Sequence, residues 1–170
     1  MFTATSFTKM AIVLQELGAT TSRKKKIQAL SSFLKELDQE EISPAVLLMS
    51  GSVFPLGDTR VLEMKGRTLH RVLTSTRQMT LEEPTLTITG LYDQLQRVAS
   101  ISGKGSRTRR EAILSALLSH ANETEREYIV RILMGELRIG LAEGLLLEAI
   151  SKAANVDQEL VKRTHTLIGD

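Results

Sequence analysis

The sequence predicts an all-α domain, and two observations support this fold class. Apolar residues recur at spacings of three and four through most of the 170-residue chain, which places them on one face of successive α-helices. No segment alternates strictly between apolar and polar residues over the length of a β-strand; residues 85–89 come closest and are too short. We therefore expect one domain over residues 1–170, an irregular multi-helix bundle of two helical halves that share one core.

The first half of the chain is a series of predicted helices. A first apolar face starts at Phe7 and ends before Gly18, and a second helix opens with the cations 23–26 after possible caps at 20–22. A third helix has Pro44 in its first turn, where proline is tolerated. The predicted helices run over residues 7–17, 23–37, 42–49 and about 61–73, with a loop over 51–57 before the last of them.

The second half continues in the same way after residues 74–84, which lack apolar periodicity and are predicted to be a surface linker. Thr89-Gly90 is predicted to cap the next helix, and either Asn122 or Thr124 to cap a later one. The predicted apolar faces lie within residues 91–99, 113–118, 128–133 and 141–153. The helix that contains 113–118 is predicted to end near His120, and a last helix is predicted over about 157–163.

Composition excludes several classes of protein. The absence of cysteine excludes disulfides and thiolate metal sites. No apolar run approaches the roughly 18 residues of a membrane span, and the first residues lack the features of a signal peptide. The net charge is only +2, so a surface for nucleic acid must come from local clustering of cations.

Residues for catalysis are sparse. The three histidines lie in separate predicted elements, no serine lies in a G-x-S-x-G turn, and Gly103-Lys-Gly-Ser lacks the spacing of a phosphate-binding loop. We therefore expect no catalytic residue and no metal ligand, and we interpret the chain as a binding module.

The strongest local signal is Gly135-Glu-Leu-Arg-Ile-Gly140, between two apolar helical patterns. Two glycines so close together predict that one helix ends, the chain turns, and another helix begins at about Leu141. The free N–H groups at the start of that helix suit an anion, and Arg138 is the cation of the turn. Arg138 is interpreted as a phosphate contact; the alternative is a structural role, tied to a carboxylate such as Glu143.

A second cationic glycine turn spans residues 103–110. From Arg97 to Arg110 there are five cations and no acid, and the glycines and hydroxyls of this turn suit contact with a phosphate backbone. The alternative is a plain helix end followed by a serine cap, and the cations 23–26 are likewise either solvated or in contact with phosphate. The candidate DNA-binding residues are Gly103, Lys104, Gly105, Ser106, Arg107, Thr108, Arg109, Arg110, Arg138, Gly140 and Leu141.

The type of binding follows from the residues that are scarce. Aromatic residues are 4% of the chain and none interleaves with the basic clusters, so stacking of single-stranded bases is not expected. No helix has the basic reading face of a major-groove binder. The sequence therefore favours sequence-independent contact with duplex phosphates across the minor groove.

Residues 87–154 resemble the N-terminal DNA-binding domain of archaeal and eukaryotic ATP-dependent DNA ligases. The resemblance is carried by Leu91-Tyr-Asp-Gln-Leu-Gln-Arg-Val-Ala99, by Gly103-Lys-Gly-Ser106, and by residues 128–144, in which Leu137-Arg-Ile-Gly-Leu-Ala-Glu143 is the most specific part. It continues more weakly over residues 7–54. The resemblance implies an all-helical domain that grips nicked duplex DNA on both sides of the nick.

The resemblance also implies a longer enzyme that closes around DNA, with an adenylation domain and an OB-fold after this domain. ATP and Mg²⁺ are implied for that enzyme and no cofactor for this part, and the expected location is the cytoplasm, with the nucleoid. No Asp-Gly pair occurs in the sequence, so the family's Lys-x-Asp-Gly motif is missing. The chain is therefore interpreted as a DNA-binding fragment that has no ligase activity by itself.

Two further interpretations concern partners. Archaeal relatives often carry a sliding-clamp motif between the helical halves, and Gln78-Met-Thr-Leu81 lies there, but Glu82-Glu83-Pro84 replaces the expected aromatics and favours a solvated linker. A helical protein-interaction domain and a stand-alone non-specific DNA-binding domain remain as alternative functions.

Overall fold

The structure is a computed structural model, and it describes residues 4–55, 57–60, 62, 66–75 and 85–168. The described residues form nine α-helices and contain no β-strand, which confirms the all-α prediction. The helices are α1 (Phe7–Ala19), α2 (Arg23–Lys35), α3 (Gln39–Ser50), α4 (Gly66–Ser75), α5 (Ile88–Ser100), α6 (Ser106–His120), α7 (Glu123–Met134), α8 (Glu143–Ala154) and α9 (Gln158–Ile168). None of these helices combines the length and the apolar character needed to cross a membrane.

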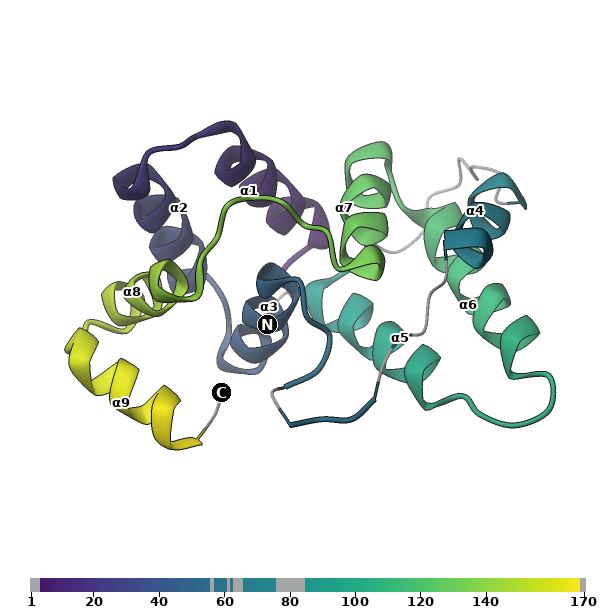
Figure 1. The fold of residues 1–170 in the computed structure, drawn as a ribbon. Coiled ribbons are helices and arrows are strands. Elements are labelled where there is room, and N and C mark those ends of the chain that lie inside the picture. Colours follow the sequence, from purple (N-terminus) through teal and green to yellow (C-terminus); the bar gives the residue numbers. More distant parts are fainter. Residues whose placement is uncertain (1–3, 56, 61, 63–65, 76–84, 169–170) are drawn as a thin grey trace.

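The helices form two groups that lie side by side (Figure 1). One group contains α1, α2, α3, α8 and α9, and its closest packing is between α2 and α8. The other contains α4, α5 and α6, with α7 beside them, although the principal packing of α7 is on α1. Contacts of α1 with α7 and of α3 with α5 join the groups. Two halves are therefore present, but they do not divide at residues 74–84, because α8 and α9 return to the N-terminal helices.

One apolar cluster runs through both groups. The predicted face of α1 is fully buried in it, and so are Leu91, Leu95 and Val98 of the predicted face of α5, whereas Ala99 is only partly buried. The buried residues of these two faces are Phe7, Met10, Ala11, Leu14, Leu17, Leu91, Leu95 and Val98.

Several helix boundaries differ from the predicted ones. Helix α4 is described from Gly66, residues 61 and 63–65 of the predicted helix lie outside the described residues, and its last residues, Thr74 and Ser75, had been predicted as linker. The side chain of Thr87, not the pair Thr89-Gly90, caps α5 by accepting a hydrogen bond from Gly90 N at 3.0 Å. Asn122 caps α7, as one of the two predicted alternatives, and the clamp-like residues 78–81 lie outside the described residues.

Helix α1 continues through Gly18, the predicted stop, to Ala19, and α2 ends at Lys35, before the predicted end at residue 37. Further differences are in α3, α8 and α9. Helix α3 starts earlier than predicted because Asp38 ends the preceding turn as its N-cap. Helix α9 continues to Ile168, five residues beyond the predicted end at Arg163, and packs along α8. Helix α8 begins at Glu143, two residues after the predicted start at Leu141, and this shift changes the description of the central turn.

Two buried glutamates hold the N-terminal segment against both groups. Glu41 of α3 accepts hydrogen bonds from Thr5 N at 2.6 Å and from Thr5 Oγ1 at 2.7 Å. Glu125 of α7 accepts one from Thr8 Oγ1 at 2.6 Å. Burial by itself raises the pKa of Glu41, but the hydrogen bonds from Thr5 and Asp38 and the nearby positive charge of Lys9 outweigh it, and the pKa lies below its ordinary 4.5.

Glu41→Gln is expected to lower stability at pH 7 by about 1–3 kcal/mol, because the charged acceptor of the Thr5 hydrogen bonds is lost. A lowered carboxyl pKa stabilises the fold above the unfolded pKa, and this stabilisation disappears as the pH falls through the folded pKa. The melting-temperature difference between the wild type and Glu41→Gln should therefore shrink below about pH 4.5. Glu40→Gln, an exposed neighbour in the same first turn, is the control and should change little. A constant difference from pH 7 to pH 3 would contradict this account.

Candidate functional site

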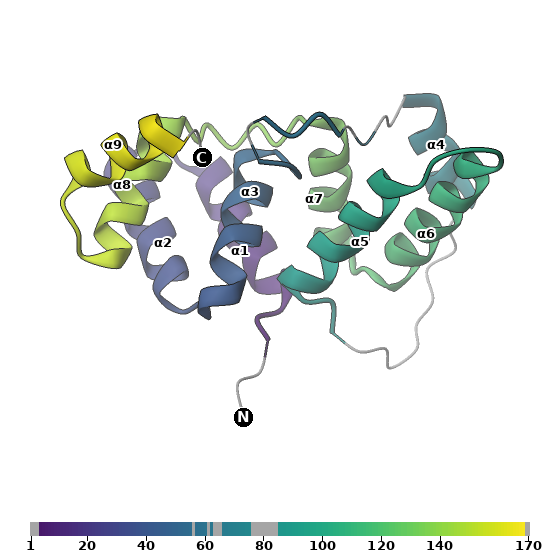
Figure 2. The same ribbon diagram turned by 90° about the horizontal axis from the view of Figure 1, so that it is seen from below.

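The segment between α7 and α8 is an extended connection and not the predicted tight turn. Gly135 ends α7 in the left-handed conformation, and the N–H groups of Gly135 and Glu136 bond back to the last carbonyls of the helix. The chain then crosses from one helix group to the other along one face of the molecule (Figures 1 and 2). The prediction of a compact junction was wrong because the two glycines do not form one turn. Gly135 ends α7, whereas Gly140 lies beside a buried lysine.

Buried and exposed side chains alternate along this connection. Leu137 and Ile139 are buried, whereas Glu136, Arg138 and Gly140 are exposed. Leu137 packs near Gly51 at the end of α3, and Ile139 packs near Gly18 of α1. The inward residues therefore fasten the connection to the core, and the outward residues face solvent.

A buried lysine, Lys26, holds the connection through hydrogen bonds to its backbone. The Nζ atom of Lys26, in the first turn of α2, donates hydrogen bonds to the carbonyl of Ile139 and, at 3.0 Å, to the carbonyl of Gly140. Gly140 has φ +61°, and a Cβ atom there would lie 2.7 Å from Lys26 Nζ. Glycine is therefore required at position 140 both for its conformation and for the space that the ammonium group occupies.

The backbone N–H groups of residues 137–144 donate no hydrogen bond to any described part of the chain. The last of them are the first N–H groups of α8, whose N-cap, Ala142, has no side chain to accept from them. A row of free donors at a helix start attracts an anion. The connection therefore carries a set of backbone N–H groups that have no acceptor in the described part of the chain.

Arg138 is the exposed cation of this row. Its φ is +48°, in the left-handed region, and its side chain is 78% exposed. The guanidinium pairs with Glu136, with Nη2 2.6 Å from Oε2. The predicted alternative was a structural bond to a carboxylate such as Glu143. The carboxylate that pairs with Arg138 is instead the exposed Glu136 of the same connection, and Glu143 lies 2.8 Å from His165.

The second predicted site, residues 103–110, is the loop before α6 together with its first turn. Gly103 and Gly105 have φ +80° and +76°, and Gly105 is the N-cap of α6, so Ser106 is inside the helix and is not the cap that one alternative predicted. Lys104 and Thr108 are exposed, and their side chains have no hydrogen-bond or ion-pair partner among the described residues. These two side chains are free to contact a phosphate.

The three arginines of this stretch have structural contacts. Arg109 donates to the carbonyls of Ser102 at 3.0 Å and Lys104 at 3.3 Å, and Arg110 donates through Nε to the carbonyl of Ile101 at 3.1 Å. Arg107 shares Glu111 with Arg71 of α4. These bonds fix the shape of the loop, and the charge of Arg109 stays exposed beside Lys104.

The two predicted sites are separate but lie on the same side of the molecule. In Figure 2 the connection runs along the upper edge, and the loop between α5 and α6 reaches the same edge at the right. One extended ligand can therefore touch both sites, whereas a small ligand cannot.

Arg23 and Lys26 fit neither of the two alternatives given for the cations 23–26. Arg23 pairs with Glu148 of α8, and Lys26 is buried, so neither is simply solvated. Lys24 and Lys25 are exposed, without an ion-pair partner in the described residues. Lys26 was missed as a functional candidate, although its position four residues before Leu30 puts it on the apolar face of α2.

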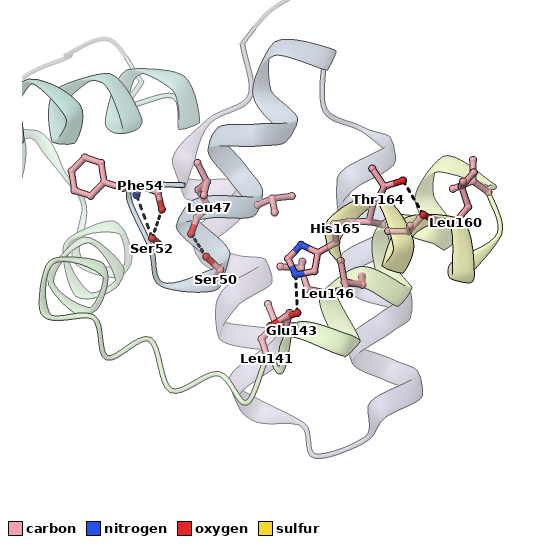
Figure 3. Close-up of a pocket in the computed structure, with 15 residues that line it drawn as sticks. Leu47, Ser50, Ser52, Phe54, Leu141, Glu143, Leu146, Leu160, Thr164 and His165 are labelled. Carbon is pink, nitrogen blue, oxygen red and sulfur yellow. Dashed lines mark hydrogen bonds and ion pairs between the residues drawn. The ribbon is translucent and has the colours of Figure 1, made fainter. Parts of the chain in front are cut away.

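A cavity of about 600 Å³ lies beyond the end of the connection, between α3, α8 and α9 (Figure 3). Its lining is mainly apolar, with Leu47, Leu146 and Leu160 from the three helices, and the His165–Glu143 pair lies at its side. Such a lining does not suit a phosphate, so the cavity is not part of the proposed anion-binding face. No group of His, Asp and Glu side chains in the described residues is arranged to hold a metal ion.

Comparison with known proteins gives a consistent match. The family described as "DNA ligase N terminus" matches residues 6–80 and 66–151. Similar proteins include DNA ligase 1 of Korarchaeum cryptofilum, 30% identical over 185 residues, with 95% of this chain and 34% of the relative covered. The DNA ligase of Methanothermobacter thermautotrophicus is 31% identical, with 96% of this chain and 35% of the relative covered.

A probable DNA ligase of Nocardia farcinica is 36% identical over 160 residues, with 91% of this chain and 28% of the relative covered. The relatives thus come from bacteria as well as archaea, which is broader than the archaeal assignment that the sequence resemblance implied. The chain spans about a third of the length of these relatives.

Proposed function

The chain belongs to the DNA ligase N-terminal family, and on this premise we propose that it is the DNA-binding domain of a longer DNA ligase. The domain holds nicked duplex DNA through phosphate contacts across the minor groove. The α7–α8 connection and the loop before α6 contact two stretches of the DNA backbone, and the rest of the enzyme seals the nick between them.

The observation that best supports this proposal is the row of free N–H groups at residues 137–144, with Arg138 among them. Backbone N–H groups and arginine side chains are common phosphate contacts, and they carry no base specificity. The loop before α6 adds Lys104 and Thr108 on the same side of the molecule. Arg109 and Arg110 shape that loop, Arg107 pairs with Glu111 of α6, and Gly103, Gly105 and Ser106 let the DNA backbone approach.

The chemistry of sealing belongs to the part of the enzyme beyond this domain. A lysine in Lys-x-Asp-Gly would accept the nucleotide there, and this sequence contains no Asp-Gly pair. ATP and Mg²⁺ are accordingly assigned to the longer protein. The domain contributes affinity and position, and nicked duplex DNA is the partner that these contacts fit.

Binding to duplex DNA should be strongly salt-dependent and nearly independent of base sequence. If about four to six phosphates are neutralised, log K should fall against log salt with a slope of roughly −4 to −5, at about −0.9 per phosphate. Fluorescence anisotropy with nicked duplexes of different sequence, titrated over a range of salt concentrations, measures both properties.

The alternatives predict different outcomes. A helical protein-interaction domain would not bind duplex DNA even at low salt. A base-specific regulator would prefer one duplex strongly over the others, and such a preference would contradict contact through phosphates alone. Equal affinity for nicked and intact duplex would favour a stand-alone non-specific DNA-binding domain.

A further inference from the structure

We propose that Lys26 is a positioning residue for DNA binding, which holds the amides of Gly140 and Leu141 toward the phosphate without itself touching DNA. The inference rests on the proposed function and extends it to a buried residue outside the DNA-binding face. Lys26 is 6% exposed, and its ammonium group is directed at the carbonyls of Ile139 and Gly140 and not at the surface as a phosphate contact would be.

The surroundings of Lys26 are unusual for a buried charge. No carboxylate among the described residues forms an ion pair with it, and its hydrogen bonds go to the carbonyls of Ile139 and Gly140. Burying an ammonium group without a counter-charge costs free energy, and an apolar side chain of similar size would pack there at lower cost. The lysine therefore has a task beyond packing, and the contacts locate that task in the connection.

The geometry of the two carbonyls shows what Lys26 imposes. In a regular extended strand, consecutive carbonyls point to opposite sides of the chain. Here the carbonyls of Ile139 and Gly140 point to the same ammonium group, which the positive φ of Gly140 permits. Lys26 thus fixes a local bend that a plain extended segment does not adopt.

The hydrogen bonds that Lys26 donates to these carbonyls also affect the N–H groups on the opposite side of the backbone. The carbonyl of Ile139 shares its peptide group with the N–H of Gly140, and the carbonyl of Gly140 shares its peptide group with the N–H of Leu141. A carbonyl that accepts a hydrogen bond polarises its peptide group and makes the attached N–H a stronger donor. Both of these N–H groups are free of partners within the described chain, so a bound phosphate gains directly from the buried charge.

Lys26→Met tests the proposal, because methionine keeps the approximate length of the side chain and removes the charge. We expect the affinity for nicked duplex to fall by about 3- to 10-fold, the scale of an ordinary net hydrogen bond, because Lys26 acts only through the amides that it positions. The slope of log K against log salt should stay unchanged, because Lys26 neutralises no phosphate itself. Lys24→Met is the matched control from the same helical turn, exposed and without an ion-pair partner in the described residues.

Two outcomes would overturn the proposal. Wild-type affinity in folded Lys26→Met would show that the amides need no support, and a slope flattened by about one unit would make Lys26 a direct phosphate contact. If the Lys26 variant unfolds at the assay temperature, Gly140→Ala replaces it, because the added Cβ would lie 2.7 Å from Lys26 Nζ and displace it. Gly140→Ala should reduce affinity with an unchanged slope, and wild-type affinity in this variant would count against the proposal.

An NMR measurement separates this inference from the proposed function. In Lys26→Met without DNA, the amide proton resonances of Gly140 and Leu141 should move upfield as their peptide groups lose polarisation. Unchanged resonances would reject the role of Lys26 even if the domain binds DNA. Conversely, a wild-type domain that does not bind duplex would reject the proposed function, while the amide shifts would still decide whether Lys26 positions the connection.

Discussion

Arg138→Ala is expected to weaken binding to nicked duplex by about 1–2 kcal/mol, or about 5- to 30-fold, while the melting temperature stays nearly unchanged. The side chain is 78% exposed and its one ion pair, with Glu136, is a surface pair, so its loss costs the fold little. Its backbone is anchored on both sides by the buried Leu137 and Ile139, so the arginine loses less freedom on binding than a side chain on a mobile loop. Anisotropy and thermal unfolding on the same variant measure the two effects.

The neighbours of Arg138 provide controls with different expected directions. Glu136→Gln should strengthen binding slightly, by less than about 1 kcal/mol, because it removes a competing carboxylate and a negative charge beside the DNA. Lys104→Ala should cost less than Arg138→Ala and mainly flatten the salt slope by about one unit. Lys35→Ala, in the last turn of α2 at the lower edge of Figure 2, should leave binding unchanged. A lower melting temperature with unchanged affinity in Arg138→Ala would show that the residue is structural.

Ile139→Ala is expected to destabilise the domain by about 2–4 kcal/mol, because a side chain that is 3% exposed leaves a cavity between the connection and α1. For a domain of this size the melting temperature should fall by roughly 5–15 °C. The matched control is Ile12→Ala, since Ile12 is 48% exposed on α1 and its truncation should stay within about 0.5 kcal/mol. Thermal unfolding of both variants measures the difference.

Equal destabilisation by Ile139→Ala and Ile12→Ala would mean that the connection is not part of the core. The expected difference in stability between the two variants has a consequence for DNA binding, because Ile139 lies between Arg138 and Gly140. Above the midpoint of its own unfolding, Ile139→Ala should lose DNA binding completely; well below that midpoint it should retain most of its affinity.

The sequence was sufficient to predict the helices but not to predict which helices pack against each other. Periodicity identified the buried faces of α1 and α5 because it reports which side of one helix is apolar, a local property. It carries no information about which helix packs on which, so the packing of α8 on α2 was not predicted. The same limit explains why the two halves were divided at the linker and not at the connection.

The DNA contacts at the connection and at the loop before α6 stay predictions, whereas the compact shape predicted for residues 135–140 was wrong. Arg138 and Lys104 are exposed, as a binding role requires, whereas the arginines 107, 109 and 110 make structural bonds that composition alone could not reveal. The alternation of apolar residues at 137, 139 and 141 was the available signal for an extended connection. This alternation was overlooked because Gly135 and Gly140 suggested a turn and because helical patterns flank the segment on both sides.

The order of the helices also bears on how the chain folds as it is synthesised. Helices α1 to α3 emerge first, yet the principal partner of α2 is α8, more than a hundred residues later in the chain. Until α8 has left the ribosome, the apolar face of α2 stays partly uncovered, and closing so long a loop slows the final docking step. Helices α4, α5 and α6 can meanwhile form their own local contacts. Folding of the first group therefore waits for the arrival of the connection, so the segment proposed to hold DNA also completes the tertiary structure.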